Sequence, residues 1–248
     1  MPQRYKLTIE YDGAFYCGWQ RQSDIEQKSV EEVIEQAINQ MASAKVKIFA
    51  SGRTDAGVHA SGQVAHFDLD KKFTPYQIIR GLNFYLRDEM IAVVDCELVD
   101  GNFHARFGAK MRHYQYRLIN RHGSIVLNKN RAWHVGKKLD LGSMKAAAKK
   151  LEGRHDFSSF RDSECQAQSP IRSIDKIEIL QNGEEIIFNF SAKSFLHHMV
   201  RNIVGTLVYV GLNKFSAKDV ELILQAKDRQ KSGPNAPACG LYFLGVDY

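Results

Sequence analysis

The sequence predicts an α+β protein with a mixed, largely antiparallel central sheet that is flanked by helices. Stretches in which apolar residues alternate, as in strands, are interleaved with stretches in which they recur every three or four residues, as in helices. Asn182-Gly183 separates two alternating stretches and is the strongest short signal for an antiparallel hairpin. Both halves of the chain mix strands with helices, so we expect two similar lobes around a central cleft.

The first half of the chain is expected to contain two helices between its strands. Ser29, with Glu32 three residues later, has the pattern of a capping box, and apolar residues then follow at helical spacing up to Met41. Thr74 as the cap and Pro75 in the first turn begin a second helix. Strands are expected at residues 5–11, 45–50, 63–67 and 90–99.

The second half is expected to contain three helices. The first spans residues 139–151 and is ended by Gly153, and the last spans about residues 218–227. Between them, apolar residues from Leu196 to Val208 form one helical stripe. Four polar residues are left on the flank of that stripe: His197, His198, Arg201 and Asn202. Strands are expected at residues 110–118, 174–180, 186–190 and 241–246.

The composition is that of an ordinary, slightly basic soluble protein. Its 248 residues can bury one large core or two small ones, and 44% of them are hydrophobic, which makes extensive disorder improbable. The 34 Lys and Arg residues exceed the 28 Asp and Glu residues by six. This charge suits a polyanionic partner such as a nucleic acid but does not identify one.

The cysteines and the apolar stretches indicate a cytoplasmic protein without membrane contact. The four cysteines are scattered and form no Cys-x-x-Cys pair, which favours free thiols in a reducing compartment over a zinc knuckle or a disulfide framework. The first residues lack the apolar core of a signal peptide. The longest mainly apolar stretch, residues 203–212, is shorter than the about 20 residues that cross a bilayer.

A polar loop at residues 51–60 interrupts two expected strands and contains the first candidate for chemistry. Gly52 and Gly57 permit unusual backbone angles on either side of Asp55. Arg53 lies two residues away, and a nearby guanidinium keeps a carboxylate ionised. Such a carboxylate could attack a carbon atom or hold a cation. An ordinary surface turn, in which Arg53 and Asp55 face water, explains the same residue types.

Three further segments have both a functional and a structural interpretation. Residues 102–107 join two aromatic rings to a cation and could stack on bases or fill the core. Tyr114 and Tyr116 lie on the same face of an expected strand, and a half-buried strand face explains two such tyrosines more simply than catalysis does. His197-His198 suggests a metal, but neighbouring residues of a helix point about 100° apart, so we expect no metal there.

The string from Gly52 to His59, Gly-Arg-Thr-Asp-Ala-Gly-Val-His, resembles the signature of the pseudouridine synthases that modify the tRNA anticodon arm, the TruA family. Further segments are similar to motifs of the same family, and together they span nearly all of the chain. These are Tyr-Asp-Gly at residues 11–13, Gly-Trp-Gln-Arg-Gln at 18–22, Phe-His-Ala-Arg-Phe at 103–107, Tyr-x-Tyr at 114–116, Asp-Phe-x-Ser-Phe at 156–160 and His-Met-Val-Arg-Asn at 198–202.

The resemblance implies a role for each matching residue. Asp55 would be the nucleophile, Arg201 its ion-pair partner, and Tyr114 the ring that stacks on the target base. Arg53 would contact the tRNA and support base flipping. Two segments would bind tRNA: Phe103, His104, Ala105, Arg106 and Phe107, and Glu164, Cys165, Gln166, Ala167 and Gln168. An N-terminal lobe at residues 1–108 would contain the Asp loop, and a C-terminal lobe at residues 109–248 the Tyr strand and the Arg helix.

The reaction implied by the resemblance is the isomerisation of uridine to pseudouridine in the anticodon stem and loop of tRNA, at positions 38, 39 and 40. The bond from ribose C1′ to uracil N1 breaks and C1′ rejoins the base at C5, so no cofactor is needed. The carboxylate would bond to C1′ or stabilise an opened sugar. The family works as a homodimer without a metal. A non-catalytic RNA-binding protein and a nucleoside hydrolase are the competing interpretations.

Overall fold

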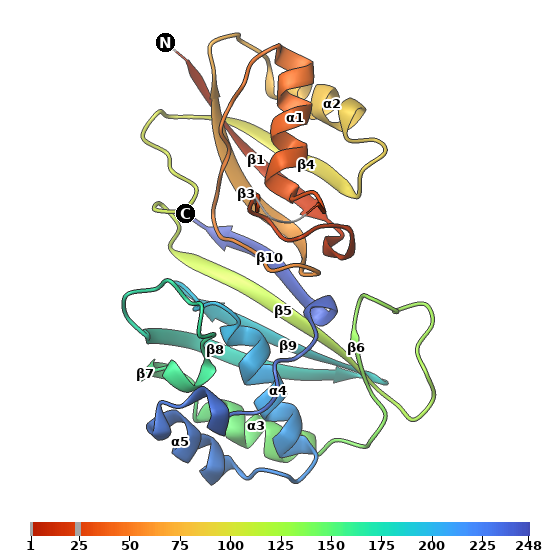
Figure 1. Cartoon of the computed structure of the whole chain (residues 1–248), viewed down its shortest axis with the longest axis vertical. Helices are drawn as coiled ribbons and strands as arrows, with labels where there is room; N and C mark the ends of the chain where they lie inside the picture. Colours follow the sequence, from red (N-terminus) through yellow and green to blue (C-terminus); the bar gives the residue numbers. More distant parts are fainter. Residues whose placement is uncertain (1, 23–25) are drawn as a thin grey trace. The chain divides into compact units, whose positions relative to one another are not determined.

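The computed structural model describes residues 2–22 and 26–248, and it has the α+β composition that the sequence predicts. Ten strands and five α-helices occur in this part of the chain, and most strand pairs are antiparallel (Figure 1). The chain divides into two compact units. Unit 1 contains Met1–Lys110 together with Tyr242–Tyr248, and unit 2 contains Met111–Leu241. The cleft between two lobes stays a prediction.

The sheet of unit 1 is built around β1 (Gln3–Tyr11), which pairs antiparallel with β3 (His59–Leu69) on one side and β4 (Ile91–Val99) on the other. The two-residue strand β2 (Phe49–Ala50) also pairs with β3. At the far end of the chain, β10 (Leu241–Asp247) pairs with β3 in parallel, through Tyr242 and His59. Unit 1 therefore combines the first 110 residues with the last seven.

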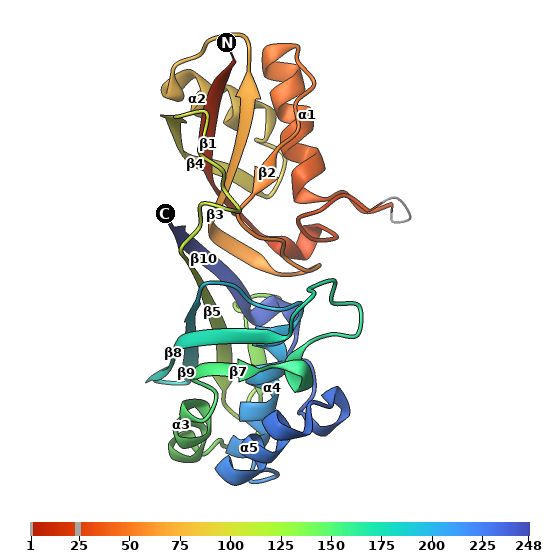
Figure 2. The ribbon, with the colours of Figure 1, turned by 90° about the vertical axis from the view of Figure 1, so that its left-hand side faces the viewer.

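Two helices lie beside this sheet, and local sequence signals fix where both begin (Figure 2). In α1 (Val30–Ala42), the Ser29 hydroxyl accepts a hydrogen bond from the Glu32 amide at 3.2 Å. In α2 (Pro75–Tyr85), Thr74 and Gln77 form a complete capping box and Pro75 occupies the first turn. Both helix starts agree with the prediction, because a cap involves only residues within one turn.

The sheet of unit 2 has the order β5 (Met111–Asn120), β9 (Glu185–Ala192), β8 (Ile171–Asn182), β7 (Gly153–Asp156), and all of these neighbours are antiparallel. The short strand β6 (Trp133–Val135) pairs with β5 in parallel. The predicted hairpin is confirmed: Asn182 pairs with Glu185, and Gly183 takes a φ of +59° in the turn. Left-handed backbone of this kind suits glycine.

Three helices complete unit 2: α3 (Leu141–Lys149), α4 (Met199–Gly211) and α5 (Ala217–Ala226). Helix α4 is buried on nearly all sides, and the loop after α5 passes directly against it. A Cβ atom at Gly205 would overlap the Pro234 carbonyl, and the Gly233 amide donates to the Thr206 hydroxyl at 2.9 Å. Gly205 thus allows the loop at residues 233–236 to lie on the helix.

Three expectations about local structure are wrong. The strand expected at residues 45–50 is reduced to β2, because only Phe49 and Ala50 pair with β3. The helix expected from Leu196 begins at Met199. Asn202, expected on the polar flank of that helix, is fully buried. The apolar stripe does not predict this burial, because it depends on partners elsewhere in unit 2.

Within the described residues, no helix combines the length and the apolar character that crossing a bilayer requires.

Candidate active site

The Asp55 loop of unit 1 is fixed by its backbone. Asp55 is half-buried and forms an isolated antiparallel bridge with Gly18. The Trp19 amide donates to the Thr54 carbonyl at 3.0 Å, and the Val58 amide donates to the Asp55 carbonyl at 3.1 Å. Gly18 has a φ of +109°, and a Cβ atom there would lie 2.6 Å from the Thr54 carbonyl. The segment around Gly18 is therefore a backbone brace for the loop.

Two buried polar side chains hold the loop from behind. The Tyr11 hydroxyl lies 2.8 Å from the Thr54 hydroxyl. The Gln63 amide nitrogen donates to the Gly52 carbonyl at 2.8 Å, and the Gln63 carbonyl accepts from the Ser51 hydroxyl at 2.7 Å. Gln63 is completely buried. The part of the loop that precedes Asp55 is thus joined to strands β1 and β3, through two residues that the sequence did not indicate, Tyr11 and Gln63.

The negative charge of Asp55 affects the pKa of the buried Tyr11. Burial raises the pKa of Tyr11, and the negative charge of Asp55 raises it further, against the opposing effect of its hydrogen bond with Thr54. Tyr11 therefore stays a neutral phenol beside the carboxylate.

Gly57 takes the left-handed conformation expected for it, with a φ of +78°, whereas Gly52 keeps a negative φ. Arg53 is exposed.

The segment at residues 103–107, also in unit 1, separates into an anchor and an exposed tip. Ala105 is fully buried, and its amide donates to His66 Nδ1 at 3.2 Å. Phe107 is 79% exposed, and the Arg106 guanidinium lies 5.8 Å from its ring centre. Burial lowers the pKa of His66 to about 4, with the charges of Arg4 and His104 adding to the effect. His66 is therefore neutral near pH 7 and can accept the Ala105 hydrogen bond.

The other two residues of that segment, Phe103 and His104, pack against neighbouring aromatic rings. The ring of Phe103 is half-buried and lies 4.8 Å from the ring of Tyr248. The ring of His104 lies 4.4 Å from that of Phe107. Of the five residues that the sequence analysis expected to bind tRNA, Arg106 and Phe107 are thus the ones most exposed to a partner.

In unit 2 the two tyrosines of β5 differ in burial. Tyr116 is completely buried, and its hydroxyl donates to the Pro237 carbonyl at 2.8 Å. Tyr114 is half-buried, and its ring meets that of Phe195 edge to face with 5.1 Å between centres. Tyr116 therefore belongs to the core, whereas Tyr114 keeps part of its ring accessible.

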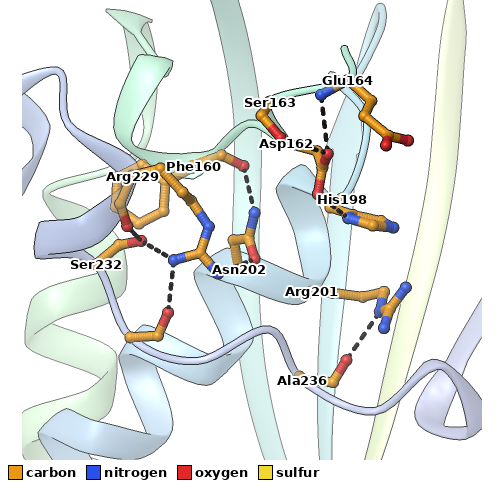
Figure 3. Close-up of polar contacts among 11 residues, drawn as sticks. Phe160, Asp162, Ser163, Glu164, His198, Arg201, Asn202, Arg229, Ser232 and Ala236 are labelled. Atoms are coloured by element: carbon orange, nitrogen blue, oxygen red, sulfur yellow. Dashed lines mark hydrogen bonds and ion pairs between the residues drawn. The ribbon is translucent and has the colours of Figure 1, made fainter.

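Arg201 is fixed by reciprocal hydrogen bonds with Ala236 (Figure 3). Its Nε donates to the Ala236 carbonyl at 2.8 Å, and the Ala236 amide donates to the Arg201 carbonyl at 3.2 Å. The loop at residues 233–236 that carries Ala236 packs on α4 at Gly205. One edge of the guanidinium is thus held in a fixed plane.

A buried polar network supports that loop. Asn202 Nδ2 donates to the Phe160 carbonyl at 3.0 Å, and its Oδ1 accepts from Arg229 at 2.8 Å. Arg229 also donates to the Ser232 hydroxyl at 2.8 Å and to the Gly233 carbonyl at 3.0 Å (Figure 3). Sequence reasoning missed Arg229, because nothing near it in the chain indicates a partner on α4.

His198 forms a short pair with Asp162 at the start of α4. His198 Nδ1 lies 2.6 Å from Asp162 Oδ2, and His198 is the N-cap residue with a left-handed φ of 60°. The other carboxylate oxygen of Asp162 accepts from the Glu164 amide at 3.0 Å. This backbone bond is the largest influence that lowers the pKa of Asp162, and His198 lowers it further. The carboxylate is therefore ionised near neutral pH.

The histidine pair itself is arranged differently from the expectation. His197 and His198 both precede the helix, and their ring centres lie 4.0 Å apart. The helical geometry expected at His197 and His198, from which we expected no metal, is therefore wrong. The absence of a bound metal stays a prediction.

The Asp162 pair also positions the second segment expected to bind tRNA. The Asp162 amide donates to the His197 carbonyl, and the Cys165 amide donates to the Asp162 carbonyl. Glu164, Gln166 and Gln168 are exposed, and Cys165 and Ala167 are half-buried. This loop and the start of α4 are thus joined through one carboxylate.

The structure therefore groups the candidate residues in two sets. Asp55, Arg53 and the segment at residues 103–107 belong to unit 1, and Tyr114, Arg201 and the segment at residues 164–168 belong to unit 2. That the two sets act on one nucleotide stays a prediction.

Comparison with known proteins assigns the class of enzyme. Residues 7–108 and 147–248 match the family described as tRNA pseudouridine synthase. These two stretches contain the Asp55 loop and the Arg201 helix. The chain belongs to the tRNA pseudouridine synthase family and is an isomerase of uridine in tRNA.

Two relatives match almost from end to end. The chain is 48% identical over 245 residues to tRNA pseudouridine synthase A of Bradyrhizobium diazoefficiens, covering 99% of each chain. It is 46% identical over 245 residues to tRNA pseudouridine synthase A of Maricaulis maris, covering 99% of this chain and 98% of the relative. A crystal structure of a Cbf5-Nop10-Gar1 complex aligns with 84% of this chain and 44% of that one, at 13% identity and a TM-score of 0.36, too low a score to support a conclusion.

Proposed function

We propose that this enzyme isomerises uridines in the anticodon stem and loop of tRNA, with Asp55 as the nucleophile. The observation that carries the proposal is the support of the Asp55 loop by the Gly18 bridge and by hydrogen bonds with Tyr11 and Gln63. A side chain that attacks C1′ must be held close to its productive geometry, and such positioning is a large part of catalysis. An ordinary surface turn does not need buried supports of this kind.

In this proposal Arg201 pairs with Asp55 and keeps it ionised and aimed. The hydrogen bond from Nε to Ala236 fixes the plane of the guanidinium, so that its Nη edge can meet a carboxylate with two parallel hydrogen bonds. Lysine could not form that bidentate contact. Tyr114 contributes the accessible part of its ring as the surface on which uracil stacks, while Tyr116 anchors the strand.

Base flipping follows from the chemistry. A uracil inside a stem is out of reach of Asp55, and its extrusion costs a few kcal/mol of unstacking. Arg53 is exposed and two residues from Asp55, so it can occupy the position that the base leaves and contact the phosphates. Arg106, Phe107 and the loop at residues 164–168 bind the surrounding tRNA.

We infer a cytoplasmic homodimer as the working form. Each chain carries a formal charge of +6, so two chains carry 2 × 6 = +12, a stronger field for a polyanion. Solution scattering at the working concentration tests the dimer, and the mass of a single chain would contradict it.

The nucleophile is tested with Asp55→Asn, which keeps the size of the side chain but removes its charge. We expect the variant to fold and bind tRNA without forming pseudouridine, measured by primer extension after carbodiimide treatment. Asp95→Asn, an exposed carboxylate of β4 in the same unit, is the matched control and keeps full activity. Normal product from Asp55→Asn would remove Asp55 from the mechanism, and free uracil in the reaction would indicate a hydrolase.

A further inference from the structure

The isomerisation requires a proton to leave C5 of uracil after C5 has bonded to C1′. Forming the bond from C5 to C1′ breaks any bond from C1′ to the nucleophile, so the C5 proton can pass to the released carboxylate or to a second base nearby. Breaking the C5–H bond returns its electron pair to the ring, and N1, which left with the electron pair of the glycosidic bond, gains a proton. One base that takes the proton from C5 and supplies one to N1 balances the reaction without a co-reactant.

We propose that His198, oriented by Asp162, is the base that accepts the C5 proton. The proposal rests on the proposed function, in which Arg201 meets Asp55 at the target nucleotide. His198 is the N-cap residue of α4, and Arg201 lies in the first turn of the same helix. Figure 3 shows both side chains projecting to the same side of α4.

The contact with Asp162 prepares the ring for this role. A carboxylate at 2.6 Å from Nδ1 favours the tautomer with hydrogen on Nδ1, which makes Nε2 the basic nitrogen. The carboxylate also stabilises the imidazolium that forms when Nε2 takes a proton, as in a Ser-His-Asp triad. Asp162 is itself held in place, because its carboxylate accepts a hydrogen bond from the Glu164 amide and its own backbone amide donates to the His197 carbonyl.

The left-handed backbone conformation of His198 is a second observation that supports the proposal. A left-handed conformation is uncommon for a residue other than glycine, and here it stands directly at the N-cap of α4. The His198 side chain makes no capping bond to that helix. The side chain is therefore directed toward Asp162, in an arrangement that capping does not require.

Several charged or titratable groups surround His198 in unit 2. Asp162 contacts Nδ1, the His197 ring lies 4.0 Å from it, and Arg201 follows on the next turn. Beyond these, Arg229 lies within the electrostatic reach of Asp162.

The decisive experiment measures single-turnover rates on tRNA with hydrogen or deuterium at C5 of uridine. His198→Gln is expected to lower kcat by about 10²- to 10⁴-fold, the usual contribution of a general base, with little change in KM. The C5 proton step then limits the rate, so the deuterated tRNA reacts clearly more slowly. A rate that is unchanged, or that falls with no isotope effect, overturns the proposal.

Two further variants separate chemistry from folding. His198→Asn keeps a residue that tolerates the left-handed backbone and should show the same isotope effect. Asp162→Asn should lower kcat with little change in KM and show the same isotope effect, which a purely structural link between loop and helix would not produce. His134→Gln, a histidine of β6 bonded to the Arg121 carbonyl, is the control with normal kinetics.

Different results would contradict Asp55 as the nucleophile and His198 as the base. Pseudouridine formation by Asp55→Asn would contradict the nucleophile whatever the behaviour of His198. An inactive Asp55→Asn together with a slow His198→Gln that lacks an isotope effect would contradict the base alone.

Discussion

Asn202→Ala removes the side chain that joins three segments of unit 2, and its cost follows from the two hydrogen bonds that disappear. The bond from Arg229 involves a charged donor and contributes about 1.5–3 kcal/mol, and the neutral bond to Phe160 about 0.5–1.5 kcal/mol. We therefore expect the free energy of unfolding to fall by about 2–4.5 kcal/mol. Because Arg229 also holds the loop that contains Ala236, kcat should fall as well.

Urea denaturation can measure this loss in unit 2 alone. The chain has two tryptophans, Trp19 in unit 1 and Trp133 in unit 2, so a Trp19→Phe background leaves Trp133 as the only indole probe. Gln225→Ala, an exposed residue of α5, is the control and should stay within about 0.5 kcal/mol of the parent. A stability of Asn202→Ala equal to that of this control would refute the reasoning, because it would mean that the network contributes nothing to folding.

Three other perturbations have expected outcomes. Gly205→Ala should lower both the melting temperature and kcat, because the new Cβ overlaps the Pro234 carbonyl and displaces the loop that holds Arg201; an unchanged melting temperature would show that the loop yields without cost. Gln63→Leu should keep tRNA affinity but reduce kcat, because two hydrogen bonds at the base of the Asp55 loop are lost; a loss confined to affinity, in filter binding, would contradict this. His66 binds a proton less readily when folded, with a pKa of about 4 against 6.5, so the unfolded chain carries more protons between these values. Stability should therefore fall as pH drops from 6.5 to about 4, and His66→Gln should flatten that part of the denaturation profile.

Local signals predict the fold where the cause is local. Three features agree with the sequence analysis: the helix cap at Ser29, the helix cap at Thr74 and the turn at Gly183. Each of them involves only residues that are a few positions apart in the chain. Asn202 could not be predicted in the same way. Its partner Arg229 is 27 residues away, so a polar residue beside an apolar stripe gives no sign that it is buried.

In the candidate site, too, the sequence predicts what has a local cause and does not predict contacts between residues far apart in the chain. The motif around Asp55 identifies the carboxylate, but the supports of its loop, Tyr11 and Gln63, come from two strands that pair only after folding. Gln63 is a polar residue at the start of an expected strand, directly after the Asp55 loop, and this position is the one signal in the sequence that points to it. The link between Asp162 and His198 spans 36 residues, and no spacing rule predicts it.

The return of the last seven residues to unit 1 affects how the protein is made on the ribosome. Tyr242 stacks on His59 beside the Asp55 loop, and the Tyr248 hydroxyl donates to the Ala105 carbonyl at 2.8 Å. These residues are synthesised after the whole of unit 2. These contacts of unit 1 therefore form only after unit 2 has been synthesised, and nascent chains that stop at residue 241 would lack both of them.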